Sequence, residues 1–211
     1  MINNIQTIRD LLKFPSENSF YFLEIIKRRK ENPEMERGQK LIKDFYVYSF
    51  EEYDELVPKV VALCEEHNAR AYFRLNLRNA KAVALRYNVA VGTALLNESY
   101  KALPKLYAST VGGTQSDPDK TWVIDLDNEE ALPEFYTPML NFIGSLRENA
   151  VVALIPTLNG LHIIARPFNR MEFAKIYPNV DIHKDNPTIM YAPAQIVTLV
   201  PTAVWSGDFY D

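Results

Sequence analysis

Two carboxylates separated by a single residue are the first sign of chemistry in this chain. They are Asp125 and Asp127, at the end of the apolar segment TWVIDLD, residues 121–127. Alternate side chains of a strand share a face, so both acids point to one side while the large apolar residues of the segment point to the other. Because like charges this close repel each other, a cation between them would stabilise the pair. The spacing therefore suggests a divalent metal site.

The same acids also have a purely structural interpretation. The stretch DLDNEEAL places negative charge where a helix could begin, and Asp127 or Asn128 is a plausible N-cap. The spacing alone does not decide between a cap and a metal site.

Two further segments carry residue types that could complete such a site. His162 follows a turn at Asn159-Gly160, and in a strand it shares a face with Arg166. Asp181 follows an apolar residue ahead of the last core strand, and Asp185 is a rival third carboxylate. Considered singly, the histidine is more often a packed or solvated residue, and each acid is more often a turn residue.

The elements that would position these residues follow a recognisable order. From residue 121 the pattern predicts a strand, a helix with its apolar stripe over 132–143, a strand at 151–155 and a strand at 161–166. A short helix at 169–177 and strands at 188–192 and 195–200 follow. The order β-α-β-β-α-β indicates an RRM- or ferredoxin-like module with one open sheet face, on which the first and third strands are neighbours. His162 and the acidic pair are then expected to lie side by side.

The upstream half is predicted to be a second α/β module. Its expected elements are a helix at 5–12, strands at 20–26 and 41–48, a helix opened by a capping box at Ser49 and Glu52, a strand at 69–76 and a helix at 79–97. We place the N-terminal α/β module at 1–110 and the catalytic module at 111–211, in an α/β (α+β) fold. The irregular segment 108–120 is expected to connect them, although contact with a phosphate or a template is an alternative.

The overall composition is that of an ordinary soluble globular protein. Of its 211 residues, 47% are hydrophobic and 24% charged, and the net charge of −4 does not suggest a nucleic-acid binder, although a local basic patch is compatible with it. The basic run KRRKENPEMERGQK is expected to be a solvated hairpin loop rather than a nucleic-acid contact. Arg74, Arg78 and Lys120 are candidate contacts to backbone phosphates, with ordinary surface charges as the alternative.

The cysteine content and the hydropathy of the chain indicate its cellular compartment. The single cysteine, Cys64, excludes an internal disulfide or a cysteine-rich zinc site, and it lies on an apolar helical stripe, so we expect it in the core. The N-terminus lacks the apolar stretch of a signal peptide, and no apolar run is long enough for a membrane span. These features predict a cytoplasmic protein without a membrane partner.

Three sequence blocks together resemble a known family. VIDLD, IPTLNGLHII and NVDIHKD are similar, in order and in spacing, to the three motifs of the archaeo-eukaryotic primase (primase-polymerase) superfamily. The resemblance covers mainly residues 121–193. The chain as a whole also resembles small stand-alone proteins of phages and mobile elements. The second motif often has a serine where this chain has Gly160. No zinc-binding cysteine set and no helicase domain is attached, so any helicase would be a separate chain.

The resemblance implies roles for individual residues. Asp125, Asp127 and Asp181 would hold Mg²⁺ or Mn²⁺, while Gly160 and His162 would contact the phosphates of an incoming nucleotide. Arg166 is a further nucleotide-phosphate candidate, because it is a cation on the strand face of His162. The implied function is a nucleotidyltransferase that uses nucleotide triphosphates to make or extend a primer on single-stranded DNA. The alternatives are a catalytically inactive nucleic-acid-binding replication accessory protein and a metal-dependent nuclease.

Overall fold

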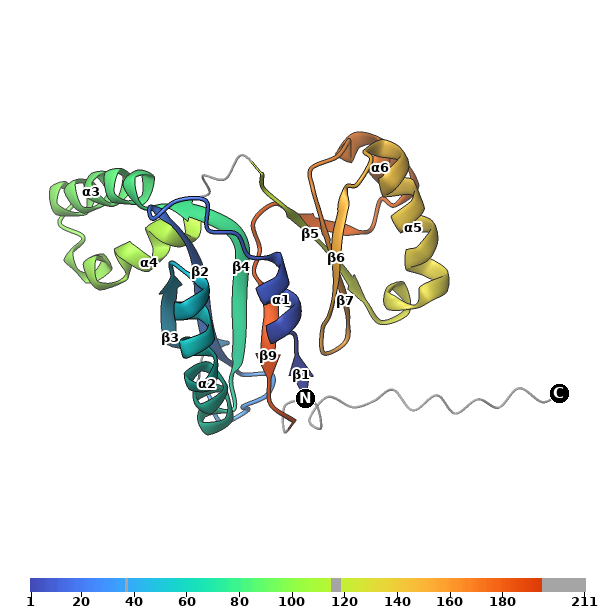
Figure 1. Cartoon of the computed structure of the whole chain (residues 1–211). Helices are drawn as coiled ribbons and strands as arrows, with labels where there is room; N and C mark the ends of the chain where they lie inside the picture. The colour runs from blue at the N-terminus through green and yellow to red at the C-terminus, as the bar shows by residue number, and fades with distance from the viewer. Residues whose placement is uncertain (37, 115–118, 195–211) are drawn as a thin grey trace.

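The strands of this chain form two antiparallel sheets (Figure 1). The computed structural model describes residues 1–36, 38–114 and 119–194. The first sheet has the order β1 (Ile2–Asn3), β9 (Thr188–Ala192), β4 (Arg70–Asn79), β2 (Ser19–Arg28) and β3 (Gln39–Val47). The second has the order β6 (Val151–Pro156), β7 (Gly160–Ala165), β5 (Trp122–Asp127) and β8 (Asp181–His183). The expected mixed α+β class is confirmed.

Six α-helices of the described residues flank these sheets. They are α1 (Ile5–Leu11), α2 (Phe50–His67), α3 (Ala80–Leu96), α4 (Leu103–Gly113), α5 (Pro133–Leu146) and α6 (Arg170–Ile176). Figure 1 shows α5 and α6 together on one side of the second sheet and the α3–α4 pair beside the first. Within the described ranges, no helix is both long enough and apolar enough to cross a membrane.

Local sequence signals explain where two of the helices begin. At α2 the Ser49 hydroxyl accepts from the Glu52 amide at 3.1 Å, and the Glu52 carboxylate accepts from the Tyr48 amide at 2.8 Å. The first bond is the expected N-cap interaction, and the second reaches the amide one residue before the N-cap, so together they satisfy two amides that have no partner inside the helix. At α6 the Asn169 side chain accepts from the amides of residues 171 and 172, as expected for an Asx cap.

The core lies on both faces of the second sheet, and the expectation of one open sheet face is therefore wrong. Trp122, Ile124 and Leu126 are buried against α5 and α6, as the alternation in β5 predicted. Val123 and Ile164, on the opposite face, join a larger core that includes α1, α2 and the first sheet. The two sheets therefore share apolar packing, and the polar ends of β5 and β7 lie beside that shared core.

The structure corrects two expectations about the elements. The strand at 188–192, expected to close the second sheet, joins the first between β1 and β4, and β8 takes the expected position instead. Residues 108–113, expected to be irregular, complete α4, which has a proline in its first turn. The expected strand at 195–200 lies outside the described residues.

Candidate functional site

The register of the second sheet brings the candidate residues to one face. Asp125 on β5 lies directly opposite His162 on β7 and opposite Asp181 on β8. Opposed residues of antiparallel strands project to the same side, and Asp127 follows two positions after Asp125. The prediction that the histidine strand neighbours the acidic strand is confirmed.

Asp125 and His162 form the polar centre of this face. Nε2 of His162 lies 3.2 Å from Oδ1 of Asp125, and its Nδ1 lies 2.8 Å from Oγ1 of Thr188. The hydrogen bond from His162 lowers the pKa of Asp125 below its usual value, although partial burial opposes this shift. Asp125 is therefore an ionised carboxylate at neutral pH.

A cleft of about 430 Å³ opens over this pair and has residues of both sheets in its walls. The second sheet contributes Asp125, Asp127, His162 and His183, whereas the first contributes Arg28, Arg70 and Tyr72, with Lys30 just beyond the end of β2. One wall therefore carries carboxylates and imidazoles, and the other carries guanidinium groups and an ammonium. Such a cleft has the charge pattern to bind a ligand that contains both phosphate groups and a metal cation.

Two arginines of the basic wall converge on one phenol. Nη1 of Arg28 and Nη1 of Arg70 each lie 3.3 Å from the Tyr72 hydroxyl oxygen. Arg70 also forms an ion pair with Glu31, whose side chain is buried. Tyr72 and Glu31 thus fix the position of Arg70, while Lys30 is exposed at the rim of the cleft.

The three candidate metal ligands do not come together as closely as the resemblance implies. Asp181 is exposed on β8 and is not among the residues that line the cleft. Across residues 1–36, 38–114 and 119–194, no three His, Cys, Asp or Glu side chains come close enough together to hold a metal ion. Asp125 and Asp127 are the carboxylates that the cleft itself presents.

Gly160 allows a close approach between two strands. It pairs with Asp127, and a Cβ atom at this position would collide with the backbone carbonyl of Leu126. The absence of a side chain is therefore required for the β5–β7 contact, independently of any ligand.

Arg166 lies at a different place from His162. It follows the end of β7, its Nη1 donates to the carbonyl of Asn149 at 2.6 Å, and it lines a second cavity of about 510 Å³ together with Lys13 and Asp119. The structure therefore does not bring Arg166 to the cleft that contains His162.

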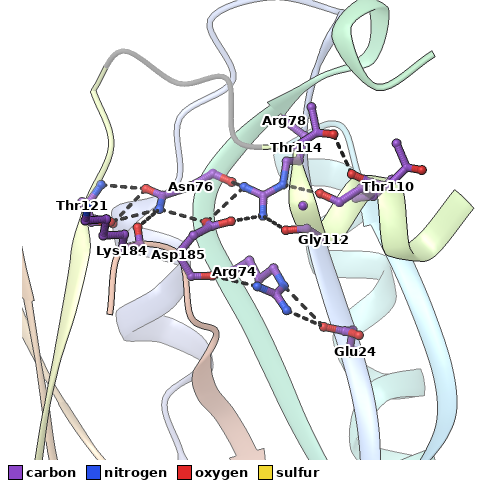
Figure 2. Close-up of polar contacts among 12 residues, drawn as sticks. Glu24, Arg74, Asn76, Arg78, Thr110, Gly112, Thr114, Thr121, Lys184 and Asp185 are labelled. Atoms are coloured by element: carbon purple, nitrogen blue, oxygen red, sulfur yellow. Dashed lines mark hydrogen bonds and ion pairs between the residues drawn. The ribbon is translucent and has the colours of Figure 1, made fainter. Parts of the chain in front are cut away.

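Arg78 and Asp185 form a buried polar junction (Figure 2). Arg78 Nε donates to the Val111 carbonyl at 2.8 Å, Nη1 to the Asn76 carbonyl at 2.8 Å, and Nη2 to Oδ2 of Asp185 at 2.7 Å. The Arg78 side chain is 0% exposed. Arg78 therefore does not reach the surface as a phosphate contact, and Asp185 is engaged in this junction rather than presented to the cleft.

The other two candidate phosphate contacts, Arg74 and Lys120, differ in whether their side chains are free to bind a ligand. The Arg74 side chain is 20% exposed and pairs with Glu24 at 3.4 Å, and its Nη1 donates to the Asp185 carbonyl at 2.7 Å. Lys120 is exposed, just ahead of β5. Of the three candidates, Lys120 is the one whose side chain is free to meet a large ligand without breaking an ion pair that the structure records.

The sequence interpretation overlooked several residues of the cleft. Arg28 and Lys30 lie in the basic run, where a solvated loop was the favoured interpretation, yet both line the cleft. His183 had a usable signal, since alternation in the strand Asp181–His183 places it on the face of Asp181. Thr188 had none, because its neighbour His162 is 26 residues away in the chain.

Comparison of this chain with protein-family models, with curated proteins and with solved structures found no match.

Proposed function

We propose that this chain is a metal-dependent nucleotidyltransferase of primase-polymerase type, which makes or extends a primer on single-stranded DNA. The observation that carries the proposal is the cleft itself. Its acidic wall presents Asp125, which is ionised, together with the side chain of Asp127, and its basic wall presents Arg28, Arg70 and Lys30. A nucleotide triphosphate with a bound divalent cation is complementary to both walls.

The carboxylates fit a metal that arrives with its substrate. Mg²⁺ in phosphoryl-transfer sites is commonly held by one or two carboxylates together with water and substrate phosphates. Asp125 and Asp127 would supply those oxygens, whereas Asp181 is in register with Asp125 on the neighbouring strand but lies outside the lining of the cleft. When bound, Mg²⁺ or Mn²⁺ would stabilise the charge that develops on the reacting phosphate.

The other residues have separate roles in this proposal. The basic wall binds and orients the anionic triphosphate, with the Arg28 guanidinium and the exposed Lys30 as the direct phosphate contacts, because Arg70 is held by Glu31. The His162 ring lies next to the carboxylates, and its single Nε2 proton, which faces Asp125 in the structure, could be donated to a phosphate oxygen in place of that carboxylate. The strand order β6-β7-β5-β8, with α5 and α6 in the connections, supports an RRM-like catalytic module packed on the first sheet.

The test is incorporation of labelled nucleotides on primed and unprimed single-stranded DNA, with Mn²⁺ or Mg²⁺. We expect Asp125→Asn and Asp127→Asn each to lower the rate by about 100- to 1000-fold, the usual loss when a group that stabilises developing charge is removed. The matched control is Glu148→Gln, an exposed acid away from the cleft, which should leave the rate unchanged. No incorporation by the wild type, or equal incorporation by Asp125→Asn, would refute the proposal.

A catalytically silent nucleic-acid-binding protein is the second candidate. It is favoured because both ring nitrogens of His162 already have protein partners and because the described residues contain no three-ligand metal group. This candidate predicts salt-dependent binding of single-stranded DNA without nucleotide incorporation. Binding that is unchanged by Mn²⁺, combined with no incorporation, would favour it over the enzyme.

A further inference from the structure

Thr188 is a residue of the first sheet whose side chain contacts His162 of the candidate site. It lies on β9 of the first sheet and is 0% exposed, whereas His162 lies on β7 of the second. Its hydroxyl lies 2.8 Å from Nδ1 of His162, on the opposite side of the ring from the nitrogen that faces Asp125. The ring is thus held at both ends by groups from different sheets.

The burial of Thr188 decides the direction of this hydrogen bond. Within the part of the chain that the structure describes, His162 is the recorded partner of the Thr188 hydroxyl. A buried hydroxyl that does not donate its proton carries a desolvation penalty, so the proton is expected to point at Nδ1. Nδ1 is then the acceptor, and the ring proton resides on Nε2, which faces Asp125.

We propose that Thr188 is a positioning residue, which holds the His162 ring in the orientation that directs the Nε2 proton to Asp125 and into the cleft. Rotating the ring by half a turn would place carbon atoms against both the hydroxyl and the carboxylate, with the loss of both hydrogen bonds. Thr188 pairs with Phe73 on β4, the strand that carries Arg70 and Tyr72. The hydroxyl therefore also fixes the histidine relative to the basic wall.

The consequence for substrate binding rests on the proposed function. If a nucleotide phosphate replaces Asp125 as the acceptor of the Nε2 proton, the fixed ring binds it without first being ordered. Loss of the hydroxyl then weakens nucleotide binding, although Thr188 itself touches no substrate.

The primary experiment needs no activity. Correlation spectra of ring nitrogens and protons are recorded for ¹⁵N-labelled wild type, Thr188→Val and Thr188→Ser at one slightly alkaline pH, where histidine is ordinarily neutral. Valine preserves the shape without the hydroxyl, and serine restores the hydroxyl. We expect the wild type to show protonated Nε2 and hydrogen-bonded Nδ1. In Thr188→Val the Nδ1 signal should move to the position of a nitrogen without a hydrogen bond, and in Thr188→Ser it should return.

His67 at the end of α2, outside the cleft, reports on folding in the same spectra, and His183 reports on the integrity of the cleft wall. Unchanged His162 signals in Thr188→Val, or a wild type protonated at Nδ1, would overturn the proposal. In an incorporation assay, Thr188→Val should raise KM for nucleotide by about three- to tenfold, the value of one net hydrogen bond, with a smaller effect on kcat. A changed spectrum with unchanged KM would overturn the link to substrate, whereas a wild type without activity would refute the proposed function and leave the spectra as the test.

Discussion

Replacing Asp185 by asparagine tests whether this acid is structural or a metal ligand. The substitution removes the negative charge that faces Arg78, whose side chain is 0% exposed, while Asp185 itself is 22% exposed. It also removes a charge-assisted hydrogen bond of 2.7 Å and places an amide donor next to the guanidinium in one of its two orientations. Burial lowers the pKa of Arg78, and the attraction of Asp185 opposes that shift, so the asparagine variant leaves a costly cation in the interior.

The expected loss follows from these contacts. Removing one partner of a buried ion pair costs about 3–5 kcal/mol, and because Asp185 retains some solvent contact we expect about 2–3 kcal/mol for Asp185→Asn. Arg78→Met should cost at least as much, because it strands the carbonyl oxygens of Asn76 and Val111. The double variant should be less unstable than the sum of the two, with a coupling of about 1–3 kcal/mol.

The assay is urea unfolding followed by circular dichroism, with and without Mn²⁺. The matched control is Asp54→Asn, which breaks an exposed ion pair with Arg9 at 2.6 Å and should have a much smaller effect. If Asp185→Asn keeps wild-type stability without metal but loses stabilisation by Mn²⁺, then Asp185 is a metal ligand and the structural interpretation is refuted.

Three further predictions use the same unfolding measurement or a simple chemical probe. Gly160→Ala should lower the free energy of unfolding by about 1–3 kcal/mol, because the new Cβ would collide with the β5 backbone. The control Gly92→Ala, in open space on α3, should raise it by up to about 1 kcal/mol. Equal effects of the two substitutions would contradict the close approach of β5 and β7. Because the pKa of Asp125 is lowered in the fold, its stabilising contribution is complete above its usual pKa of 3.8 and is lost as pH falls through the folded value. Asp125→Asn should therefore be less stable than wild type near neutrality, and the difference should shrink in acid; a constant difference would contradict this. Burial raises the pKa of the Cys64 thiol to about 12, so a thiol reagent should label it only after denaturant is added, and rapid labelling of the native chain would show that it is accessible.

Periodicity predicted the elements of the site better than it predicted their partners. The alternation in TWVIDLD correctly assigned Trp122 to the core against one face and Asp125 to the opposite face, because a strand has only two faces. The order of elements after residue 121 also correctly made the His162 strand a neighbour of the Asp125 strand. These predictions depended on local geometry and on a small choice of chain topologies.

The exposure of charged residues was harder to predict from the sequence, because the charge of a residue does not reveal whether its side chain is buried. Arg78 and Lys120 are both basic residues outside any motif, yet Arg78 is enclosed by carbonyl groups and Asp185, while Lys120 is exposed. Likewise Arg28, in a run that has the composition of a solvated loop, lies in the wall of the cleft. Each outcome depends on partners that are distant in the chain.

The sequence by itself determined which residues of β5 share a sheet face and where α2 and α6 begin, since strand alternation and capping act over a few residues. Only the tertiary structure decided what stands across the cleft from them. The return of β9 into the first sheet places Thr188 against His162, and the packing of the two sheets sets Arg28 and Arg70 opposite Asp125. Contacts between segments so far apart depend on how whole elements pack together, and no short pattern of residues encodes that arrangement.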